Sequence, residues 1–172
     1  MGTITDLIEI PHWYALYTRS RHEKKVDAQL KEKSIESYLP LHTVIRQWSD
    51  RKKKVEEPLF RCYVFVHLAL QDYLKALRTY GVVRMISFGG KPSVIPDSQI
   101  EAVKRLLQEG LAVESCEYLK EGQWVEVVQG PLTGLQGILL EKRGGQNLVI
   151  SISSIRQSIS VQIDAHLVKP IY

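Results

Sequence analysis

The chain has 172 residues with a formal net charge of +4, and 44% of its residues are hydrophobic and 24% charged. This ordinary globular balance excludes a disordered, collagen-like or coiled-coil chain. No stretch approaches the roughly 18 to 20 apolar residues of a membrane span, and the first eleven residues lack the pattern of a secretion signal. We therefore expect a cytoplasmic monomer with no membrane contact. Cys62 and Cys116 are expected to be ordinary thiols of a reducing compartment.

Strands and helices alternate in the first 110 residues. Alternation and β-propensity predict strands, and apolar residues three or four apart predict helices. The Ser20-to-Glu23 spacing is that of a capping box at the start of the first helix. The second helix is expected to turn Leu74 and Leu77 inward, and the third is expected to turn Ile100, Val103 and Leu107 inward. The strands are expected at 13–18, 37–48, 52–57, 62–68 and 82–88, and the helices at 21–33, 71–79 and 96–110.

The pattern changes after Gly110. Residues 111–118 show no clear period and are expected to be a linker, whereas helix signals vanish after Leu119. Period-two alternation at 148–152 and 159–163 is typical of short strands in a small barrel. The sequence thus predicts an α+β domain over 1–110, an antiparallel sheet flanked by helices, and an all-β barrel over 119–172.

Positive charge is concentrated in the first part of the chain. Residues 1–110 hold 18 Lys/Arg against 13 Asp/Glu, whereas residues 111–172 hold 5 against 6. Such basic clusters can neutralise phosphates, or they can simply be solvated faces. The two clusters are Arg19, Arg21, Lys24 and Lys25, then Arg51, Lys52, Lys53 and Lys54.

Two groups of motifs carry a resemblance to a known family. The first comprises Trp13-Tyr14-Ala15-Leu16-Tyr17-Thr18, Pro58-Leu59-Phe60 and Tyr63-Val64-Phe65-Val66. It resembles the N-terminal domain of the NusG family of transcription elongation factors. The second is Gly122 to Val127 followed by Gly130-Pro131-Leu132-Thr133-Gly134-Leu135-Gln136-Gly137. It resembles the KOW motif of the SH3-like barrel in these factors, and Gly130, Gly134 and Gly137 suit turns and close backbone approach.

The resemblance implies a function without enzymatic activity, cofactor or metal. Such factors bind the clamp helices of RNA polymerase, suppress pausing and promote antitermination. The clamp contact is expected at Tyr17, Phe60, Tyr63, Phe88, Ile100 and Val103, although Val103 also suits the core. Arg19, Arg21, Lys24 and the Arg51–Lys54 cluster are expected to bind nucleic acid, which would be upstream or non-template DNA or nascent RNA.

Some residues depart from the family pattern. Arg61 and Cys62 stand where Pro followed by Gly or Asn is usual. Leu132 replaces a Phe through which general NusG proteins contact a ribosomal protein or Rho, so these partners are weaker expectations. The stretch Gln47 to Lys53 resembles the specialised paralogues RfaH, LoaP and UpxY, which act on particular long operons. One of these can fold its C-terminal domain as a helical hairpin, but the alternation at 148–163 favours a barrel.

Two other functions remain open at this stage. One is a general NusG-like elongation factor, and the other is an RNA-binding or ribosome-associated KOW protein. The net charge of −1 over residues 111–172 disfavours the latter, since RNA-binding barrels are usually basic. An enzyme is not expected, because the five histidines have no partners at metal-ligand spacing and no nucleophile elbow occurs.

Overall fold

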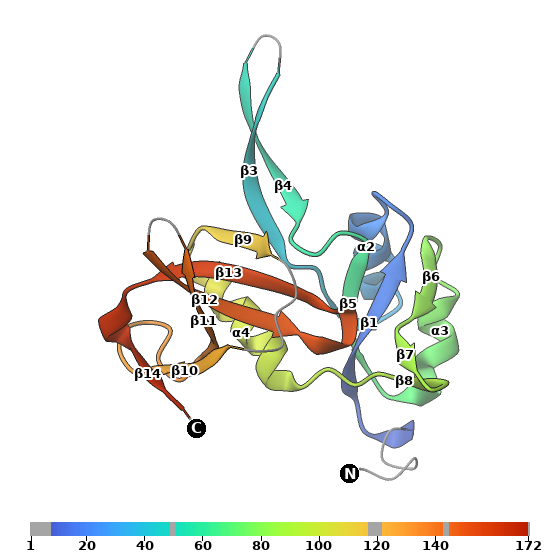
Figure 1. The fold of residues 1–172 in the computed structure, drawn as a ribbon. Coiled ribbons are helices and arrows are strands. Elements are labelled where there is room, and N and C mark those ends of the chain that lie inside the picture. Colours follow the sequence, from blue (N-terminus) through green and yellow to red (C-terminus); the bar gives the residue numbers. More distant parts are fainter. Residues whose placement is uncertain (1–7, 49–50, 117–121, 143–144, 172) are drawn as a thin grey trace. The chain divides into compact units, whose positions relative to one another are not determined.

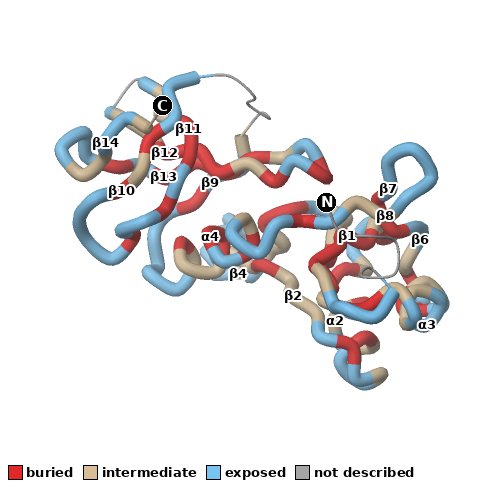
Figure 2. The backbone as a smooth tube through the Cα atoms, turned by 90° about the horizontal axis from the view of Figure 1, so that it is seen from below, coloured by how far each residue is buried: buried red, intermediate tan, exposed pale blue. Residues whose placement is uncertain are grey.

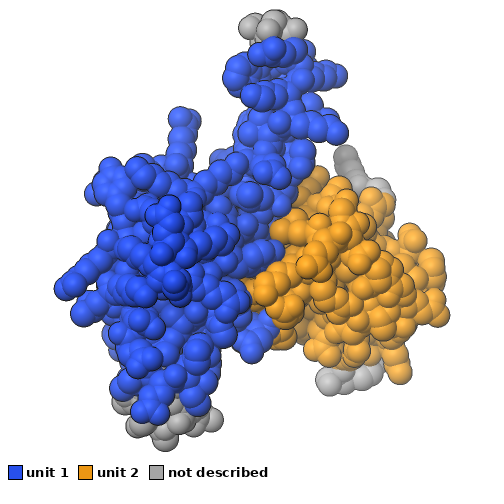
Figure 3. All heavy atoms as spheres, turned by 180° about the vertical axis from the view of Figure 1, so that it is seen from behind, with its two compact units in different colours: residues 1–97 blue, residues 98–172 orange. Residues whose placement is uncertain are grey.

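The structure, a computed structural model, describes residues 8–48, 51–116, 122–142 and 145–171. The chain divides into two compact units, residues 1–97 and 98–172, which are coloured separately in Figure 3. The helix near residue 100 is grouped with the C-terminal unit, whereas the sequence places it in a domain ending at Gly110. The predicted limits 1–110, 111–118 and 119–172 stay a prediction. The turn at Ser49-Asp50 and the junction of residues 118 and 119 lie outside the described residues.

A four-stranded antiparallel sheet organises the N-terminal unit (Figure 1). The two inner strands pair over their whole length, with Leu16 opposite Val64 and Tyr17 opposite Tyr63. Both inner strands are rich in β-branched and aromatic residues, which favour a pleated, buried surface. In spatial order the strands are β2 (Glu36–Tyr38), β5 (Tyr63–Leu68), β1 (His12–Thr18) and β6 (Val82–Met85).

One face of this sheet is covered by helices α2 (Glu23–Glu32) and α3 (Tyr73–Leu77). Val26 and Leu30 of α2 lie one turn apart and are fully buried. They share a hydrophobic core with residues from alternate positions of the strands, which Figure 2 colours red as buried. That core consists of Tyr14, Leu16, Val26, Leu30, Ile35, Val64, Val66, Leu68, Ala76 and Met85.

Two small hairpins accompany the sheet. Strands β3 (Leu41–Gln47) and β4 (Lys52–Pro58) pair only with each other, and none of their residues is buried. Strands β7 (Ser87–Phe88) and β8 (Lys91–Pro92) form a second pair. The β3–β4 hairpin is therefore a solvated projection of the N-terminal unit, as its charged sequence predicts (Figure 1).

The C-terminal unit contains helix α4 (Asp97–Gln108) and a six-stranded antiparallel sheet. The apolar residues predicted to alternate at 148–152 and 159–163 are buried in strands, so no helical hairpin replaces them. Val149 and Ser160 are buried as well, so burial itself does not alternate there. In spatial order the strands are β14 (Val168–Pro170), β10 (Gln123–Val127), β11 (Gln136–Lys142), β12 (Gly145–Ile152), β13 (Gln157–Ile163) and β9 (Val113–Cys116).

The structure differs from the predicted elements at two strands and in the expected linker. The strand predicted at 37–48 is interrupted at Leu39-Pro40, where proline offers no backbone N–H to a ladder. The strand predicted at 82–88 is interrupted at Ile86. Residues 113–116 of the expected linker form β9 and pair with β13, a long-range contact that local periodicity does not reveal.

Three helix details were also predicted wrongly. Ser20 does not cap α2: the helix begins after His22 without a side-chain cap, and the Glu23 carboxylate accepts the Cys62 N–H at 2.8 Å instead. Leu74 is 58% exposed, because the short helix α3 packs the small Ala76 against the sheet. In α4 it is Leu106 rather than Leu107 that is fully buried.

Cys62 occupies a strained backbone conformation, with φ at 65° in the left-handed region. This conformation costs an ordinary residue roughly 1–2 kcal/mol, which explains why Gly or Asn suits the position. We expect Cys62→Gly to raise the free energy of unfolding by about 0.5–1 kcal/mol, since greater freedom of the unfolded chain offsets part of the gain. Denaturant titration measures the change.

Cys116→Gly is the matched control for this substitution. Cys116 lies in strand β9, where glycine weakens a strand by about 0.5–1 kcal/mol. The two glycine variants should therefore change stability in opposite directions. A Cys62→Gly variant as destabilised as Cys116→Gly would show that the loop before Tyr63 is unstrained.

Candidate functional site

The second face of the N-terminal sheet is aromatic. Trp13, Ala15 and Tyr17 of β1 alternate with the core residues Tyr14 and Leu16, so they lie on the face away from the α2–α3 core. In β5 the residues that alternate with the core residues Val64, Val66 and Leu68 extend this surface, and Tyr38 of β2 pairs with one of them, Phe65. We call it the aromatic face, and it comprises Trp13, Ala15, Tyr17, Tyr38, Tyr63, Phe65 and His67.

Ring contacts between neighbouring strands hold the aromatic face together. The Tyr17 and Tyr63 rings meet edge to face with centroids 5.5 Å apart, and Trp13 stacks on His67 at 5.1 Å. Phe60 packs against Phe65 edge to face at 5.7 Å. Such aromatic pairs contribute about 0.5–1.5 kcal/mol beyond burial, so these rings are held in fixed positions.

Tyr17 and Tyr63 are partly exposed at one end of the aromatic face. Tyr38 and His67 are also partly exposed, whereas Trp13, Ala15 and Phe65 are buried. Arg84 stands opposite Tyr17 on β6, with its guanidinium carbon 5.6 Å from the ring centroid. Burial raises the pKa of Tyr63, and the neighbouring Tyr17 raises it further while Arg84 lowers it. The Tyr63 phenol is therefore neutral at physiological pH, and both rings can offer an apolar body and a polar tip to a partner.

The six residues expected at a polymerase contact do not share one exposed surface. Phe60, Ile100 and Val103 are at most 1% exposed, whereas Phe88 is 60% exposed. Phe60 is occupied against Phe65, and the two α4 residues belong to the C-terminal unit. Tyr17, Tyr63 and Phe88 are thus the members that present side-chain surface in this structure.

The first basic cluster gathers around an aromatic residue that sequence reasoning missed. Tyr80 is 56% exposed, and its ring lies 4.7 Å from Lys25 Nζ and 5.6 Å from the Arg19 guanidinium carbon. The Arg19 N–H donates to the Gly81 carbonyl at 2.8 Å, which fixes this approach. Lys24 Nζ instead donates to the Glu56 carbonyl at 2.8 Å. The signal available in the sequence was a tyrosine directly before a glycine, Tyr80-Gly81.

The second cluster lies on the β3–β4 hairpin. Arg51, Lys52, Lys53 and Lys54 are all exposed, as their charge predicts. Lys53 Nζ lies 5.4 Å above the ring of Trp48, which is itself 51% exposed. Trp48 belongs to the motif Gln47 to Lys53, but the motif does not show that it is exposed. Its exposure follows from the fact that β3 and β4 pair only with each other.

The KOW loop is a network of short backbone hydrogen bonds. The Gly134 N–H donates to the Val127 carbonyl at 2.7 Å, and Thr133 Oγ1 donates to the Gly130 carbonyl at 2.6 Å. Gly130 and Gly134 have φ near 85°, as expected for glycines that turn the chain. Arg105 of α4, which the sequence did not single out, donates to the carbonyls of Pro131 and Thr133 at 2.9 and 2.8 Å.

Leu132 does not project from the KOW loop. It is only 6% exposed and lines a groove of about 420 Å³ within the C-terminal unit, together with Leu111, Val127, Pro131 and Leu167. The Leu132 side chain therefore packs within the C-terminal unit and does not project into solvent.

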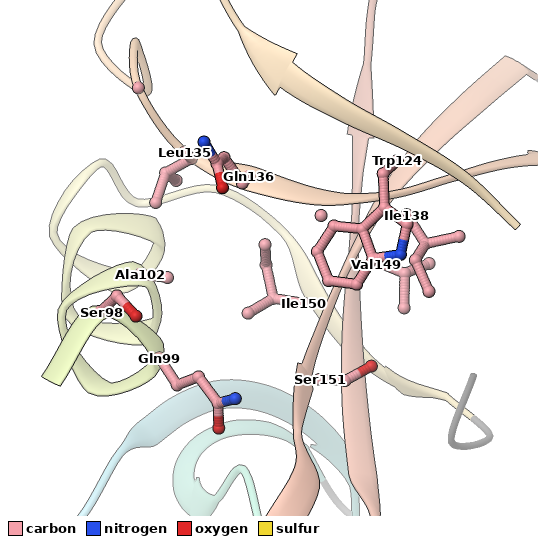
Figure 4. A pocket seen from close by; sticks show the side chains of 12 residues that line it. Ser98, Gln99, Ala102, Trp124, Leu135, Gln136, Ile138, Val149, Ile150 and Ser151 are labelled. Carbon is pink, nitrogen blue, oxygen red and sulfur yellow. The ribbon is translucent and has the colours of Figure 1, made fainter. Parts of the chain in front are cut away.

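A second cavity, of about 390 Å³, lies in the same unit (Figure 4). Ser98, Gln99 and Ala102 of α4 line one side, and Trp124 lies on the other. None of its lining side chains is an acid, a base or a thiol, so no lining group could activate the hydroxyls of Ser98 and Ser151 as nucleophiles. Within the described ranges, no three His, Cys, Asp or Glu side chains are placed to hold a metal ion. No helix there is long and apolar enough to cross a bilayer.

Comparison with known proteins identifies the family. The family model described as transcription termination factor nusG matches residues 11–104, more than half of the chain. This chain belongs to the NusG family. The NusG termination/antitermination protein of Lactococcus lactis subsp. lactis (strain IL1403) is 23% identical over 174 residues, 92% of each chain. That of Pasteurella multocida (strain Pm70) is 25% identical over 180 residues, 94% of this chain and 96% of its own.

A solved structure supports the same fold. The structure described as "Domain interaction in Thermotoga maritima NusG" is 24% identical, covers 94% of this chain and 98% of its own, and has a TM-score of 0.56. The predicted fold class, a NusG-type N-terminal domain followed by an all-β region, is confirmed. The prediction of a transcription factor without enzymatic activity is also confirmed, and the family is one of transcription termination and antitermination. NusG membership does not separate a specialised paralogue from a general factor.

Two KOW glycines of this NusG-family protein are needed for different reasons. A Cβ on Gly137 would lie 2.5 Å from the Val149 carbonyl oxygen, whereas Gly134 has open space but φ at 85°. We expect Gly137→Ala to lower the free energy of unfolding by about 2–3 kcal/mol through overpacking. Gly134→Ala should lower it by about 1–2 kcal/mol through backbone strain.

Asparagine variants separate the two causes in thermal and denaturant unfolding. Asn tolerates the left-handed region, so Gly134→Asn should recover part of the stability lost in Gly134→Ala. Gly137→Asn should be no better than Gly137→Ala, because its Cβ meets the same carbonyl. Equal recovery at both positions would refute the steric explanation for Gly137.

Proposed function

We propose that this protein binds the clamp helices of RNA polymerase, suppresses pausing and promotes antitermination of particular long operons. The observation that carries the proposal is the asymmetry of the N-terminal sheet. Helices cover one face, and on the other the paired rings of Tyr17 and Tyr63 stay partly exposed, although Trp13, Ala15 and Phe65 of the same face are buried. Partly exposed aromatic anchors beside an arginine are typical of the centre of a protein interface.

Binding alone is sufficient for this activity. A factor that contacts the elongating conformation of polymerase more tightly than the paused one shifts the population toward elongation. The shift equals the difference in affinity between the two conformations and needs no chemical step. This fits a family of non-enzymatic transcription factors.

The basic clusters support a contact with nucleic acid beside the polymerase. Arg19, Arg21 and Lys24 follow β1, and Arg51 to Lys54 lie on the β3–β4 hairpin. Upstream or non-template DNA, or nascent RNA, would supply the phosphates. The basic hairpin motif also favours a specialised paralogue over a general NusG protein, which remains the alternative. A ribosomal protein or Rho as partner of the KOW region is the weaker part of the proposal, because Leu132 is buried.

Tyr17→Ala should weaken polymerase binding by about 1–3 kcal/mol, the usual cost of losing an interface anchor. The measurement is a titration of the purified protein against the isolated clamp-helix fragment and against a reconstituted bacterial elongation complex. Tyr80→Ala is the matched control, because Tyr80 is exposed but lies with the basic cluster rather than on the aromatic face.

The outcomes separate the candidate functions. Loss of affinity for both targets in Tyr17→Ala, with Tyr80→Ala unchanged on the fragment, supports the clamp contact. Unchanged affinity in Tyr17→Ala removes that residue from the interface. Binding to free RNA but not to polymerase would instead favour the RNA-binding or ribosome-associated KOW protein.

Replacing Arg51, Lys52, Lys53 and Lys54 by Gln should make binding to the elongation complex less sensitive to salt. Each lost phosphate contact removes roughly 0.7–0.9 from the slope of log K against log salt. The same titration at several salt concentrations measures this slope. Identical slopes for the two proteins would show that the hairpin cations face only solvent.

A further inference from the structure

The distal half of the β3–β4 hairpin carries the highest concentration of net positive charge in the chain. Residues 45–54 contain five Lys or Arg against one Asp, a net charge of +4 that equals that of the whole chain. Every described residue in this stretch is exposed. A folded protein has no need of such a projection for its own core, since nothing on the hairpin is buried.

The two faces of the hairpin differ in composition. Arg46 is paired with Lys53, and Ile45 with Lys54, so the first pair and the second pair point to opposite faces. The Trp48 N–H donates to the Arg51 carbonyl at 2.8 Å, which continues the ladder toward the turn. Alternation therefore places Trp48 on the face of Arg46 and Lys53, and the contact of Lys53 Nζ with the ring at 5.4 Å agrees.

The cations of the Trp48 face have different surroundings. Arg46 donates from Nε and Nη2 to the two carboxylate oxygens of Glu57, at 2.8 and 2.9 Å, so its charge is directed to the base of the hairpin. Lys53 lies beside the indole instead. Toward the tip, the face thus presents a flat ring, 51% exposed, with an ammonium group next to it.

This combination matches one kind of ligand. An exposed indole stacks on the face of a nucleobase, and a neighbouring cation neutralises the adjoining phosphate. Bases in a duplex are already stacked on their neighbours, so only unpaired nucleotides offer a free face. We propose that the Trp48 face of the hairpin binds unpaired nucleotides, with a base stacked on Trp48 and flanking phosphates beside Lys53 and Arg51.

The proposal rests on the nucleic-acid contact proposed above and states its chemistry. Charge alone would predict binding to duplex and single strands alike, whereas stacking predicts a preference for single strands that depends on Trp48. Unpaired RNA and unpaired DNA share this chemistry, and the experiment distinguishes them.

The test uses the full chain and three fluorescein-labelled probes, an oligouridine, an oligothymidine and a duplex of the same length. Fluorescence anisotropy gives the affinity for each. Trp48→Ala should weaken binding to the single strands roughly 5- to 150-fold, the range for loss of one stacked base, and leave the duplex nearly unchanged. The single strand that binds wild type more tightly identifies RNA or DNA as the source.

The hairpin supplies its own matched controls. Ile45→Ala removes an exposed apolar side chain, 65% exposed, from the opposite face and should leave the single-strand affinity unchanged. Lys53→Gln and Lys54→Gln remove the same charge from opposite faces, and Lys53→Gln should cost more on single strands. Because Trp48→Ala could loosen the hairpin, Trp48→Phe and Trp48→Leu are added: Phe keeps a stacking surface and should retain most of the affinity, whereas Leu should lose it.

Three results would overturn the proposal. They are equal losses on duplex and single strands, equal losses for Trp48→Ala and Ile45→Ala, or retained single-strand affinity in Trp48→Leu. A loss of affinity for nucleic-acid-free RNA polymerase in Trp48→Ala, with single-strand binding intact, would assign the ring to a protein contact instead. The clamp contact is judged separately by Tyr17→Ala on the clamp-helix fragment, which contains no nucleic acid, so either proposal can fail without the other.

Discussion

The pairing of β1 with β5 is the constraint on which the N-terminal unit depends. These two strands occupy the middle of the sheet, and consecutive residues such as Tyr14 and Ala15 are both fully buried although they point to opposite faces. Helices α2 and α3 cover only one of these faces. The other carries the aromatic face, where Trp13, Ala15 and Phe65 are buried while Tyr17 and Tyr63 stay partly exposed. A shift of one residue in this pairing would exchange the two faces.

Hydrogen bonds at the ends of these strands hold the loops next to the charged surfaces. The loop that leads into β5 is held by the Glu23 carboxylate on the Cys62 N–H and by the Thr18 N–H on the Cys62 carbonyl. The chain around Arg19 is held by its bond to Gly81, which brings the basic cluster to Tyr80. Burial raises the pKa of the Cys62 thiol, and the Glu23 carboxylate raises it further, which favours the protonated form.

In the C-terminal unit, a core of buried aliphatic side chains takes the place of aromatic packing, and a glycine and an arginine shape the region of the KOW loop. Gly137 lets β11 approach β12 closely, and Arg105 joins α4 to the KOW loop through two carbonyl groups. Because Leu132 turns into its own groove, the loop surface is formed largely by backbone and polar groups. The two units thus offer partners different chemistry: aromatic and basic surfaces from the first, a hydrogen-bonded loop from the second.

Local sequence determined the order of elements, the exposed basic hairpin, the strand at 148–152 and the turn role of Gly130 and Gly134, because each depends on residues close together in the chain. Only the tertiary structure decided that Phe60, Ile100 and Val103 are buried while Phe88 is exposed, that residues 113–116 add a strand, and that Tyr80, Arg84 and Arg105 join the sites. Each of these depends on strands and helices far apart in sequence, and periodicity shows which residues share a face but not what covers it.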